Sequence, residues 1–369
     1  MPESRKRKIV LASVLKPVND VRMAEKLGVS LLKAGEFEVH VIGFPGPGQP
    51  VSGLVSHPLP FFKRLSLGRI LVRLHVARKA IALRPALFIV TTHELLGIAI
   101  LVKFLSGAKV IYDVQENYYR NILYLSTFHR LIRPVLALGV RLKEKVTSLF
   151  VNHFFLAEKE YANEFSFHAG RYTILENKAK KVDQGSLSAR DPYKLLFSGT
   201  LSESTGVFKA IEIGVLLHQL DKRISLTLIG YCPQKKTLHN IRQAIAGMPF
   251  IQLIGGDELV PHYRITKEIL SSGAGIIAYP YNPANHNSIP TKLYEYLAYR
   301  LPILLPYQGT WFTMCKPYNA AVLYGWNSIN DRRILDALLR RQFYTSTPQD
   351  IFWDDEERKL LEVVKGLIG

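Results

Sequence analysis

The stretch LLFSGTLSESTGVFKAIEIG, residues 195–214, joins an unbroken apolar run to a helical pattern through a loop of small hydroxyl residues. The apolar run has the composition of a buried strand. Gly206 opens a segment in which apolar residues recur with helical spacing. Strands of a parallel sheet that is covered on both faces read as unbroken apolar runs. The stretch therefore predicts one strand–loop–helix unit of a parallel α/β sheet.

The same unit recurs along the whole chain, because runs of strand length alternate with segments of helix length. This alternation predicts an α/β fold in which doubly wound, Rossmann-like structure occurs twice, with six strands in each half. The runs are KIVLASVL (8–15), EVHVIGF (38–44), ALFIVTT (86–92), KVIYDV (109–114), HFFLAE (153–158), YTILEN (172–177), KLLFSGT (194–200), SLTLIGY (225–231), FIQLIGG (250–256), AGIIAYP (274–280), PILLP (302–306) and AAVLYG (320–325).

A polar seam at 179–194, which carries Gly and Pro and lacks apolar periodicity, separates the halves. We therefore expect an N-terminal domain over 1–185 and a C-terminal domain over 186–349. The final stretch, 350–369, reads as an amphipathic helix. Ligands of such sheets bind beyond the carboxyl ends of the strands, so the expected site is a cleft where the strand ends of both domains meet.

Charge is placed unevenly along the 369 residues, whose net charge is +18. Residues 1–180 hold 27 Lys and Arg against 13 Asp and Glu, whereas residues 181–369 hold 21 against 17. The first half therefore favours an anionic partner. No nucleic-acid recognition motif is visible, so we expect no nucleic-acid partner. Two cysteines imply no disulfide framework, which suits a reducing, cytoplasmic compartment.

Residues 57–85 carry seven Lys and Arg and no acid, interleaved with apolar residues. Such a stretch can rest peripherally on an anionic membrane surface, or form a packed helix with a solvated basic face, and the sequence leaves both open. The apolar start of the chain is short and is stopped by Lys16 and Pro17, so it reads as a first strand rather than a signal peptide.

Two loops of the second half have the composition of a ligand site. After the strand at 194–200, backbone groups and small hydroxyls can cradle a phosphate, although this stretch taken alone favours an ordinary strand-to-helix turn with a hydroxyl cap. The strand at 250–256 ends in two glycines, which allow a planar base to approach the backbone of Ile254. Neither a Walker loop nor GxGxxG occurs. The loop residues concerned are Gly199, Thr200, Ser202, Ser204, Thr205, Gly255 and Gly256.

Lys292 stands in the first turn of a predicted helix within NSIPTKLYEYLAYRLPILLP, residues 287–306. A lysine there meets the positive end of the helix dipole, at a cost of about 0.3–1 kcal/mol. A negatively charged group near Lys292 should offset this cost. Glu295, three residues on, is one candidate, and a bound phosphate is the other. Lys292, Glu295 and Tyr299 share one helical face, which can line the site.

Polar and titratable residues also follow three neighbouring strands of the first half. Because carboxyl ends of parallel strands share one sheet edge, we expect these side chains to lie near one another. A histidine at such a position is structural as often as functional, so His93 stays open. The residues are Asn19, Asp20, Arg22, His93, Glu94, Asp113, Glu116 and Asn117.

With these pieces placed, the chain resembles the retaining glycosyltransferases of the GT-B fold, family 4 type, also called group 1 glycosyl transferases. SIPTKLYEYLAYRLPIL (288–304) is similar to their helix of the form PxKxxEaxAxGxPv, and LLFSGTLSESTGVFKAIEI resembles yvGrlxxxKGvdxai. THELLG and YDVQEN are similar to stretches of the acceptor half, and FWDDEERKLLEVVKGLI to the final helix that crosses back to the first domain. The resemblance covers nearly the whole chain.

The resemblance implies site roles for individual residues. Glu295 would hold the donor's ribose, Ile254 would contact the base through its backbone, and His93 would face the transferred sugar. Asn287 and Ser288, in the loop before the helix of Lys292, would lie against the sugar and diphosphate. We thus expect His93, Asn287 and Lys292 to be catalytic. The expected donor-binding residues are Gly199, Thr200, Thr205, Ile254, Gly255, Ser288, Lys292 and Glu295, and the expected acceptor-side residues are Asp20, Arg22 and Glu116.

Several positions depart from the family pattern. Asn287 stands where a carboxylate is usual, and Thr200 and Thr205 stand where an Arg and a Lys usually grip the diphosphate. Arg300 replaces a glycine, and Gln115 replaces a histidine. Hydrogen bonds to charged groups contribute about 1.5–3 kcal/mol each, so the loss of two cations leaves Lys292 and helix N-termini to compensate.

The expected function is the transfer of a sugar from a UDP- or GDP-linked donor to an acceptor hydroxyl with retention, in polysaccharide or glycolipid assembly. The expected enzyme needs no metal and no cofactor beyond the donor, and its acceptor is a glycan or a lipid-linked molecule at the cytoplasmic membrane face. A GT-B nucleotide-sugar epimerase and a catalytically degenerate GT-B binding subunit are the alternatives. Reaction with donor alone identifies the first, and failure to bind any nucleotide identifies the second.

Overall fold

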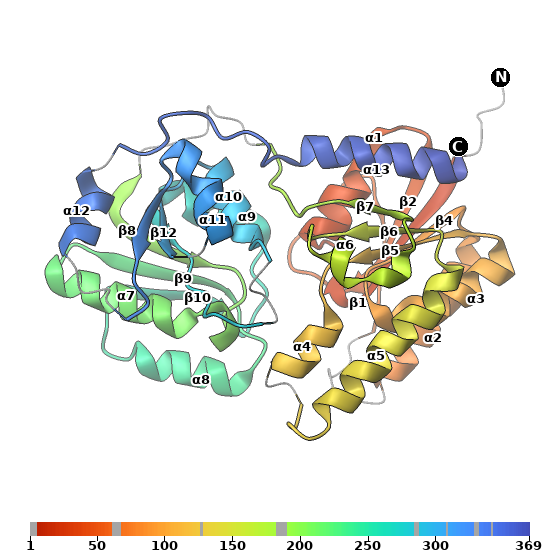
Figure 1. Cartoon of the computed structure of the whole chain (residues 1–369), viewed down its shortest axis with the longest axis horizontal. Helices are drawn as coiled ribbons and strands as arrows, with labels where there is room; N and C mark the ends of the chain where they lie inside the picture. The colour runs from red at the N-terminus through yellow and green to blue at the C-terminus, as the bar shows by residue number, and fades with distance from the viewer. Residues whose placement is uncertain are drawn as a thin grey trace. The chain divides into compact units, whose positions relative to one another are not determined.

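The computed structural model describes residues 6–60, 68–125, 128–181, 190–283, 288–307, 309–327, 332–340 and 342–369. It forms two compact units (Figure 1): unit 1 comprises 1–177 with 353–369, and unit 2 comprises 178–352. The sequence analysis placed the first boundary between 185 and 186. The structure places it earlier because Ala179 donates a backbone hydrogen bond to Ile351 (2.9 Å) and bridges to Phe352, which ties the outgoing and returning segments together within unit 2.

Unit 1 is built on a seven-stranded sheet with the order β3-β2-β1-β4-β5-β6-β7. Every neighbouring pair is parallel, as unbroken apolar runs predict. The order reverses between β1 and β4, which makes the carboxyl ends of these two strands the switch point of the sheet. The strands are β1 (Arg7–Pro17), β2 (Phe37–Phe44), β3 (Val55–Pro58), β4 (Leu87–Val90), β5 (Lys109–Val114), β6 (His153–Leu156) and β7 (Tyr172–Ile174).

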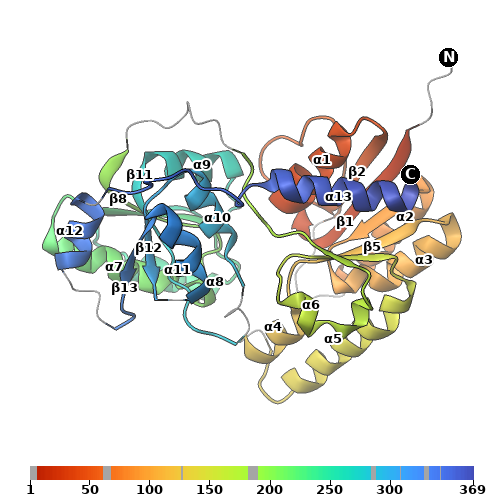
Figure 2. The same ribbon diagram turned by 45° about the horizontal axis from the view of Figure 1, so that its top comes forward.

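Helices cover both faces of this sheet (Figure 2). One face packs on α2 (Gly68–Leu83) and α3 (Leu96–Ser106), with α5 (Arg133–Thr147) beside α3. The other packs on the wide-turn helix η1 (Val21–Gly28), α1 (Val29–Lys33) and α13 (Trp353–Ile368). The indole of Trp353 donates a hydrogen bond to the Ser30 hydroxyl (2.9 Å), which fixes the start of α13 on unit 1. Three short elements, η2 (His93–Leu95), α4 (Tyr118–Tyr124) and α6 (Tyr161–Glu164), follow β4, β5 and β6.

Unit 2 is built on a six-stranded parallel sheet with the order β10-β9-β8-β11-β12-β13, so its switch point lies between β8 and β11. One face packs on α7, α8 and α12, and the other on α9, α10 and α11. The elements are β8 (Asp191–Ser198), α7 (Val207–Leu220), β9 (Ser225–Tyr231), α8 (Lys235–Ala244), β10 (Ile251–Gly256), α9 (His262–Ser271), β11 (Ser272–Ile276), α10 (Thr291–Ala298), β12 (Ile303–Pro306), α11 (Gly309–Cys315), β13 (Ala321–Tyr324) and α12 (Arg332–Arg340).

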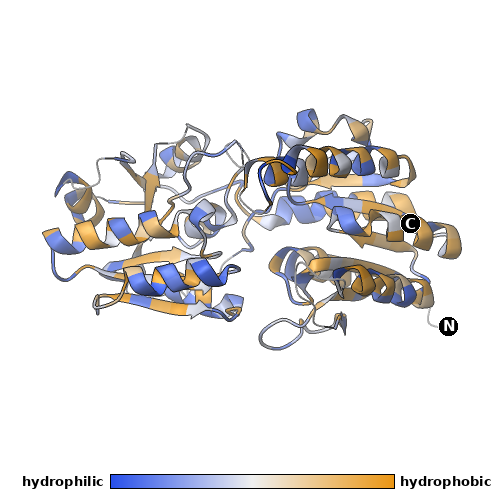
Figure 3. Ribbon diagram, turned by 90° about the horizontal axis from the view of Figure 1, so that it is seen from below, coloured by the Kyte–Doolittle hydropathy of each residue, from blue (hydrophilic) through white to orange (hydrophobic). Residues whose placement is uncertain are grey.

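Each of the twelve predicted runs overlaps one of the strands, and the two-domain α/β prediction is confirmed. The hydropathy view (Figure 3) shows hydrophobic strands between helices that are hydrophilic on their outer sides in many places. The sequence analysis missed β3, an edge strand whose four residues, Val55–Pro58, are all partly or largely exposed. The sequence of β3, VSHP, combines one apolar residue, Val55, with Ser, His and Pro, so it contains no apolar run from which a strand can be predicted.

Candidate functional site

The switch point of unit 2 brings two loops together at the carboxyl ends of β8 and β11. Gly206, at the end of the β8 loop, has φ +82, and a Cβ there would lie 1.6 Å from the backbone oxygen of Ala278. Only glycine permits this approach, which holds the loop after β8 against the segment after β11. Gly199, with φ +98, opens the same loop beside the Lys292 side chain, since a Cβ there would lie 3.7 Å from Lys292 Cε.

Lys292 is the most unusual residue of this switch point. It lies in the first turn of α10 and is only 6% exposed. Its Nζ is buried and finds no hydrogen-bond acceptor among the described residues. The ammonium group sits 3.9 Å from the ring centroid of Phe197 and 5.2 Å from that of Tyr279, so it faces two aromatic rings instead. Such contacts offset only part of the cost of burying a charge.

Burial lowers the pKa of Lys292 to about 7, and the nearby Glu295 carboxylate opposes that shift. The group is therefore about half protonated near neutral pH and gains strongly from any anion that approaches it. The position of Lys292 in the first turn of α10 predicts a negative partner nearby. No described residue supplies that partner through a hydrogen bond.

Glu295 lies one turn further along α10, and its Oε1 atom is 2.8 Å from Nε2 of His262. The side chain of Glu295 is 15% exposed, and that of His262 is 26% exposed. His262 begins α9, directly after Pro261, and the sequence analysis did not single it out. Its contact with Glu295 fixes one carboxylate oxygen, which orients the group as a hydrogen-bond acceptor.

The loop after β8 is organised by its own hydroxyls. Ser202 and Thr205 form a capping box. The Thr205 hydroxyl also donates to the Thr200 carbonyl oxygen at 2.7 Å. Thr205 therefore shapes the loop, whereas Thr200 itself is exposed. Thr200 and Thr205 occupy the two positions at which the family pattern has an Arg and a Lys. In the structure the Thr205 side chain stabilises the loop.

The other predicted donor-side residues lie around this edge. Ile254, on β10, is partly buried, and Gly255 has φ +87, where a Cβ would lie 2.5 Å from the Gly230 backbone oxygen. The carbonyl oxygen of Ser288 accepts a hydrogen bond from the Trp311 indole at 3.0 Å, which anchors the segment that leads into α10. Asn287 lies outside the described residues.

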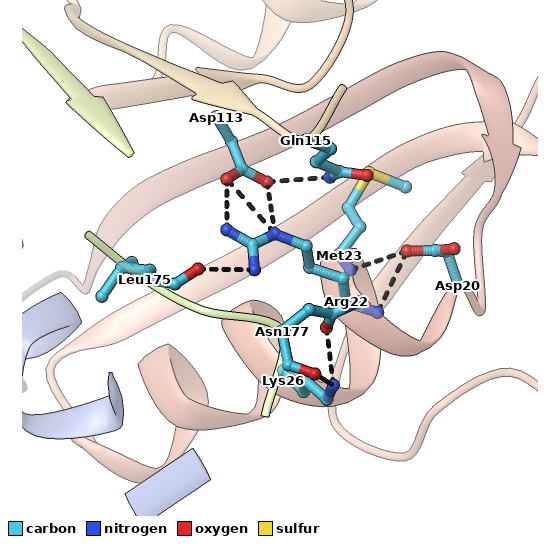
Figure 4. A network of polar contacts seen from close by, with 8 residues as sticks. All are labelled: Asp20, Arg22, Met23, Lys26, Asp113, Gln115, Leu175 and Asn177. Carbon is cyan, nitrogen blue, oxygen red and sulfur yellow. Dashed lines mark hydrogen bonds and ion pairs between the residues drawn. The ribbon is translucent and has the colours of Figure 1, made fainter. Parts of the chain in front are cut away.

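In unit 1, Arg22 is buried and engaged by other parts of the fold (Figure 4). Its Nη2 donates to Asp113 Oδ1 at 2.6 Å, its Nε to Asp113 Oδ2 at 3.0 Å, and its Nη1 to the Leu175 carbonyl oxygen at 2.9 Å. Asp20 accepts from the backbone N–H groups of Arg22 and Met23 and so caps η1. These contacts account for both residues without a ligand.

His93 lies in η2, directly beyond β4 at the switch point of unit 1. Its Nδ1 is buried without a hydrogen-bond partner among the described residues, and its ring packs edge-on against Tyr118 with centroids 4.7 Å apart. Burial, reinforced by the positive charge of Lys143, lowers the pKa of His93 to about 4, so the ring is neutral at pH 7 and can both donate and accept a hydrogen bond.

Cations gather around this histidine. Arg69 pairs with the carboxylate of Glu94, and Lys143 Nζ lies 3.5 Å from the Glu94 carbonyl oxygen. Arg73 follows Arg69 by one helical turn and has a buried Nε with no partner among the described residues. Of these three cations, Arg69 alone forms an ion pair with the Glu94 carboxylate, so the cations outnumber their bound acids and the environment favours an anion. The sequence analysis read Arg69 and Arg73 only as part of a basic stretch, because the approach of Lys143 is a tertiary contact.

Glu116, the remaining predicted acceptor-side residue, is exposed, and it accepts a hydrogen bond from the Asn121 side chain at 2.9 Å. Within the described ranges, no group of three or more His, Cys, Asp or Glu residues is arranged to hold a metal ion. No helix in the described part of the chain is long and apolar enough to cross a membrane.

Solved structures with the same architecture are found, although no family model and no curated protein sequence matches the chain. Sucrose-phosphate synthase from Thermosynechococcus elongatus superposes with a TM-score of 0.71 at 13% identity, over 98% of this chain and 99% of that one. These proteins share the two-sheet α/β organisation over almost their full lengths. The chain has the GT-B fold.

Two further GT-B structures were solved with nucleotides. HepE from Anabaena, in complex with UDP and glucose, gives a TM-score of 0.66 at 12% identity over 97% of this chain and 99% of that one. The catalytic domain of starch synthase IV from Arabidopsis thaliana, bound to ADP and acarbose, gives 0.64 at 13% identity over 99% and 100%. At these identities the likeness establishes the fold and leaves the reaction to be argued from this chain's own residues.

Proposed function

We propose that this protein is a glycosyltransferase that binds a nucleoside-diphosphate sugar at the switch point of unit 2 and transfers the sugar to an acceptor hydroxyl. The observation that carries the proposal is the buried ammonium group of Lys292, which meets aromatic rings and no hydrogen-bond acceptor among the described residues. Burying a charge without a partner is costly, and it is retained where a ligand of opposite charge completes the site.

A diphosphate is the ligand that fits this position. The ammonium lies beside Gly199, at the head of a loop that a backbone-bound anion can approach closely. The N-termini of α7 and α10 open from the two loops that meet here and add positive dipole ends. As the bond between sugar and diphosphate breaks, negative charge grows on the leaving diphosphate. Fixed positive groups lower the barrier at that stage.

Three predicted donor contacts follow from the same arrangement. Glu295, held by His262, offers a carboxylate oxygen to ribose hydroxyls. The backbone at Ile254 and Gly255 offers a flat strand end to the base. Ser288, the first described residue of the segment before α10, would lie beside the transferred sugar. UDP or GDP as the carrier, retention of configuration and independence from metal are part of the proposal, as is a role in polysaccharide or glycolipid assembly.

On the acceptor side, we propose that His93 faces the reacting sugar, and that Arg69, Arg73 and Lys143 favour an acceptor with a negative charge, such as a phosphate. The neutral His93 ring can donate to one hydroxyl and accept from another. We place this chemistry at the cytoplasmic face of a membrane, which two free, buried cysteines support because buried thiols suit a reducing compartment.

One observation favours a second candidate, a GT-B subunit that binds a partner and does not catalyse transfer. Thr200 and Thr205 carry no charge, and the Thr205 hydroxyl is engaged within its loop. The two candidates differ in nucleotide binding, because a transferase must hold the donor tightly enough to react. An epimerase, in turn, would consume the donor without any acceptor.

The test is a thermal-shift panel of UDP-, GDP-, ADP- and CMP-linked sugars. We expect one carrier to raise the melting temperature, and we expect Glu295→Ala to weaken that donor's binding by on the order of tenfold to a hundredfold, because a charge-assisted hydrogen bond to the ribose is lost. Glu258→Ala, in the loop after β10, is the matched control and should bind normally. Stabilisation by no carrier would refute the transferase proposal. Turnover of the donor alone would indicate an epimerase.

A further inference from the structure

Helix α5 is turned with its apolar side toward solvent. The residues that α5 buries are Ala137, Glu144 and Thr147. On its outer side, residues spaced by three or four positions form one apolar stripe. These residues are between 54% and 79% exposed: Leu131, just before the helix, Val135, Leu138, Leu142, Val146 and Leu149. A helix that packs only on its own sheet has the opposite pattern.

The stripe continues onto the neighbouring helix of the same sheet face. Phe150, next to Leu149, packs edge-on against Phe104 of α3 with ring centroids 5.7 Å apart. Phe104 and Leu105 are 69% and 61% exposed. On α2, which contacts α3, Leu71 and Leu74 are more than half exposed as well. These exposed side chains belong to three helices that contact one another in the order α2, α3, α5, and we call them the α5 face, defined by the α5 stripe with Phe104, Leu105, Leu71 and Leu74.

The charges on the helices of this face are almost all positive. α2, α3 and α5 carry nine Lys and Arg against one acid, Glu144. That acid is 2% exposed, and its Oε1 accepts a hydrogen bond from Tyr112 at 3.0 Å, so it contributes no surface carboxylate. Exposed cations lie at Arg78 and Lys79 of α2, at Lys145 of α5, and at Arg130 before α5.

We propose that the α5 face docks the protein on a lipid bilayer that contains anionic lipids, with the apolar stripe in the interfacial layer and the cations against the headgroups. Apolar side chains flanked by Lys and Arg, without exposed acids, match such a surface in both hydrophobicity and charge. A second copy of this chain fits less well, because its own α5 face would bring cations against cations.

This surface differs from the one that the sequence suggested. For 57–85 the sequence analysis left open a membrane contact or a packed helix with a solvated basic face, and 61–67 lie outside the described residues. In the structure most of the exposed apolar side chains lie on α5, whereas α2 contributes Leu71 and Leu74 together with exposed cations. Docking requires no transferase activity, so its test is independent of the proposed function.

The first experiment is co-sedimentation of the full chain with vesicles of phosphatidylcholine containing 30% phosphatidylglycerol, and with pure phosphatidylcholine. We expect binding to the anionic vesicles only. The double variant Leu138→Gln/Leu142→Gln should bind on the order of tenfold more weakly, since two inserted side chains become polar. Arg130→Gln/Lys145→Gln should lose on the order of tenfold as well. Tyr263→Gln, which changes an exposed aromatic residue of α9, is the control and should bind normally.

A second readout reports insertion directly. Both native cysteines are buried, so Leu142→Cys can be labelled selectively with an environment-sensitive fluorophore, and Lys235→Cys on α8 serves as the control site. We expect a blue shift on anionic vesicles at position 142 and none at position 235. Equal binding to neutral vesicles, or binding unaffected by the double variants, overturns the proposal. So does a dimer that dissociates in Leu138→Gln/Leu142→Gln without any vesicle binding, because it would assign the face to a second copy.

Discussion

Replacement of Lys292 by methionine is expected to make the protein more stable and to remove most of its affinity for the donor. Methionine has nearly the same length and fills the space between Phe197 and Tyr279 without a charge. Replacing buried ion pairs by hydrophobic side chains can stabilise a protein by about 1–4 kcal/mol, and we expect a gain of that order when this unpaired charge is removed. Losing the cation beside the diphosphate should lower kcat/KM by roughly 10²–10³-fold.

The stability gain should depend on pH. Because the pKa of Lys292 in the folded protein is about 7, below the ordinary value of 10.5, the unfolded chain binds more protons between those two values. Stability of the wild-type protein therefore rises with pH across that window. The advantage of Lys292→Met is largest at or below pH 7 and shrinks toward pH 10. Chemical denaturation at several pH values measures this difference.

Lys209 provides the matched control. It is another lysine of unit 2 with little exposure, but its Nζ is paired with both oxygens of Glu212 at 2.9 Å. Lys209→Met should bring no gain in stability and leave donor binding unchanged. If Lys292→Met proves less stable than the wild type, Nζ has a protein partner. If the variant retains full activity, the diphosphate does not meet this residue.

Asp113→Ala is expected to destabilise unit 1 by about 3–5 kcal/mol, because it leaves the Arg22 guanidinium buried with one remaining acceptor, Leu175. Denaturant unfolding checks this magnitude. The double variant Arg22→Met/Asp113→Leu removes both charges and should recover much of the loss, since a buried pair contributes little beyond an apolar replacement. Asp257→Ala, which breaks the exposed pair with Arg242, is the control and should change stability little.

This second result also decides the role of Arg22. Sequence analysis expected it on the acceptor side, and the structure shows it bound to Asp113. A stability loss in Arg22→Met that is largely recovered in the double variant fits a structural ion pair. If the double variant were stable but inactive toward every acceptor while donor binding stayed normal, Arg22 would serve the acceptor as well.

The sequence predicted the fold well for a physical reason. Strands that are buried on both faces must be apolar throughout, so the central strands left an unbroken signal, such as LFIV at β4, whose four residues are all buried. β3 left none, because its sequence, VSHP, is too short and too polar to form an apolar run. The boundary between the units lies at 177/178, eight residues before the predicted position, and Ala179 meets Ile351 and Phe352, which lie far along the chain.

The candidate site likewise has features that could be predicted from the sequence and features that could not. Lys292 could be singled out from the sequence because its conflict with the helix dipole is local. The partner of Glu295 could not, because His262 precedes it by 33 residues and meets it only in the fold. Pairing of Arg22 with Asp113 joins residues 91 positions apart. Interactions between residues close in the chain can be predicted from the sequence. The tertiary contacts that pair a charge, or leave it unpaired, cannot.

The central claim is that a diphosphate meets the ammonium of Lys292. Calorimetric titration with the donor identified by the thermal-shift panel, at pH 8 in buffers of different ionisation enthalpy, tests it most directly, because the diphosphate of a nucleotide sugar does not itself titrate there. With a pKa of about 7 in the free protein, Lys292 is mostly neutral at pH 8, and the diphosphate should recharge it. We predict net proton uptake that approaches one proton per donor bound and is lost in Lys292→Met. Donor binding with no proton uptake, or uptake that persists in Lys292→Met, would contradict the account.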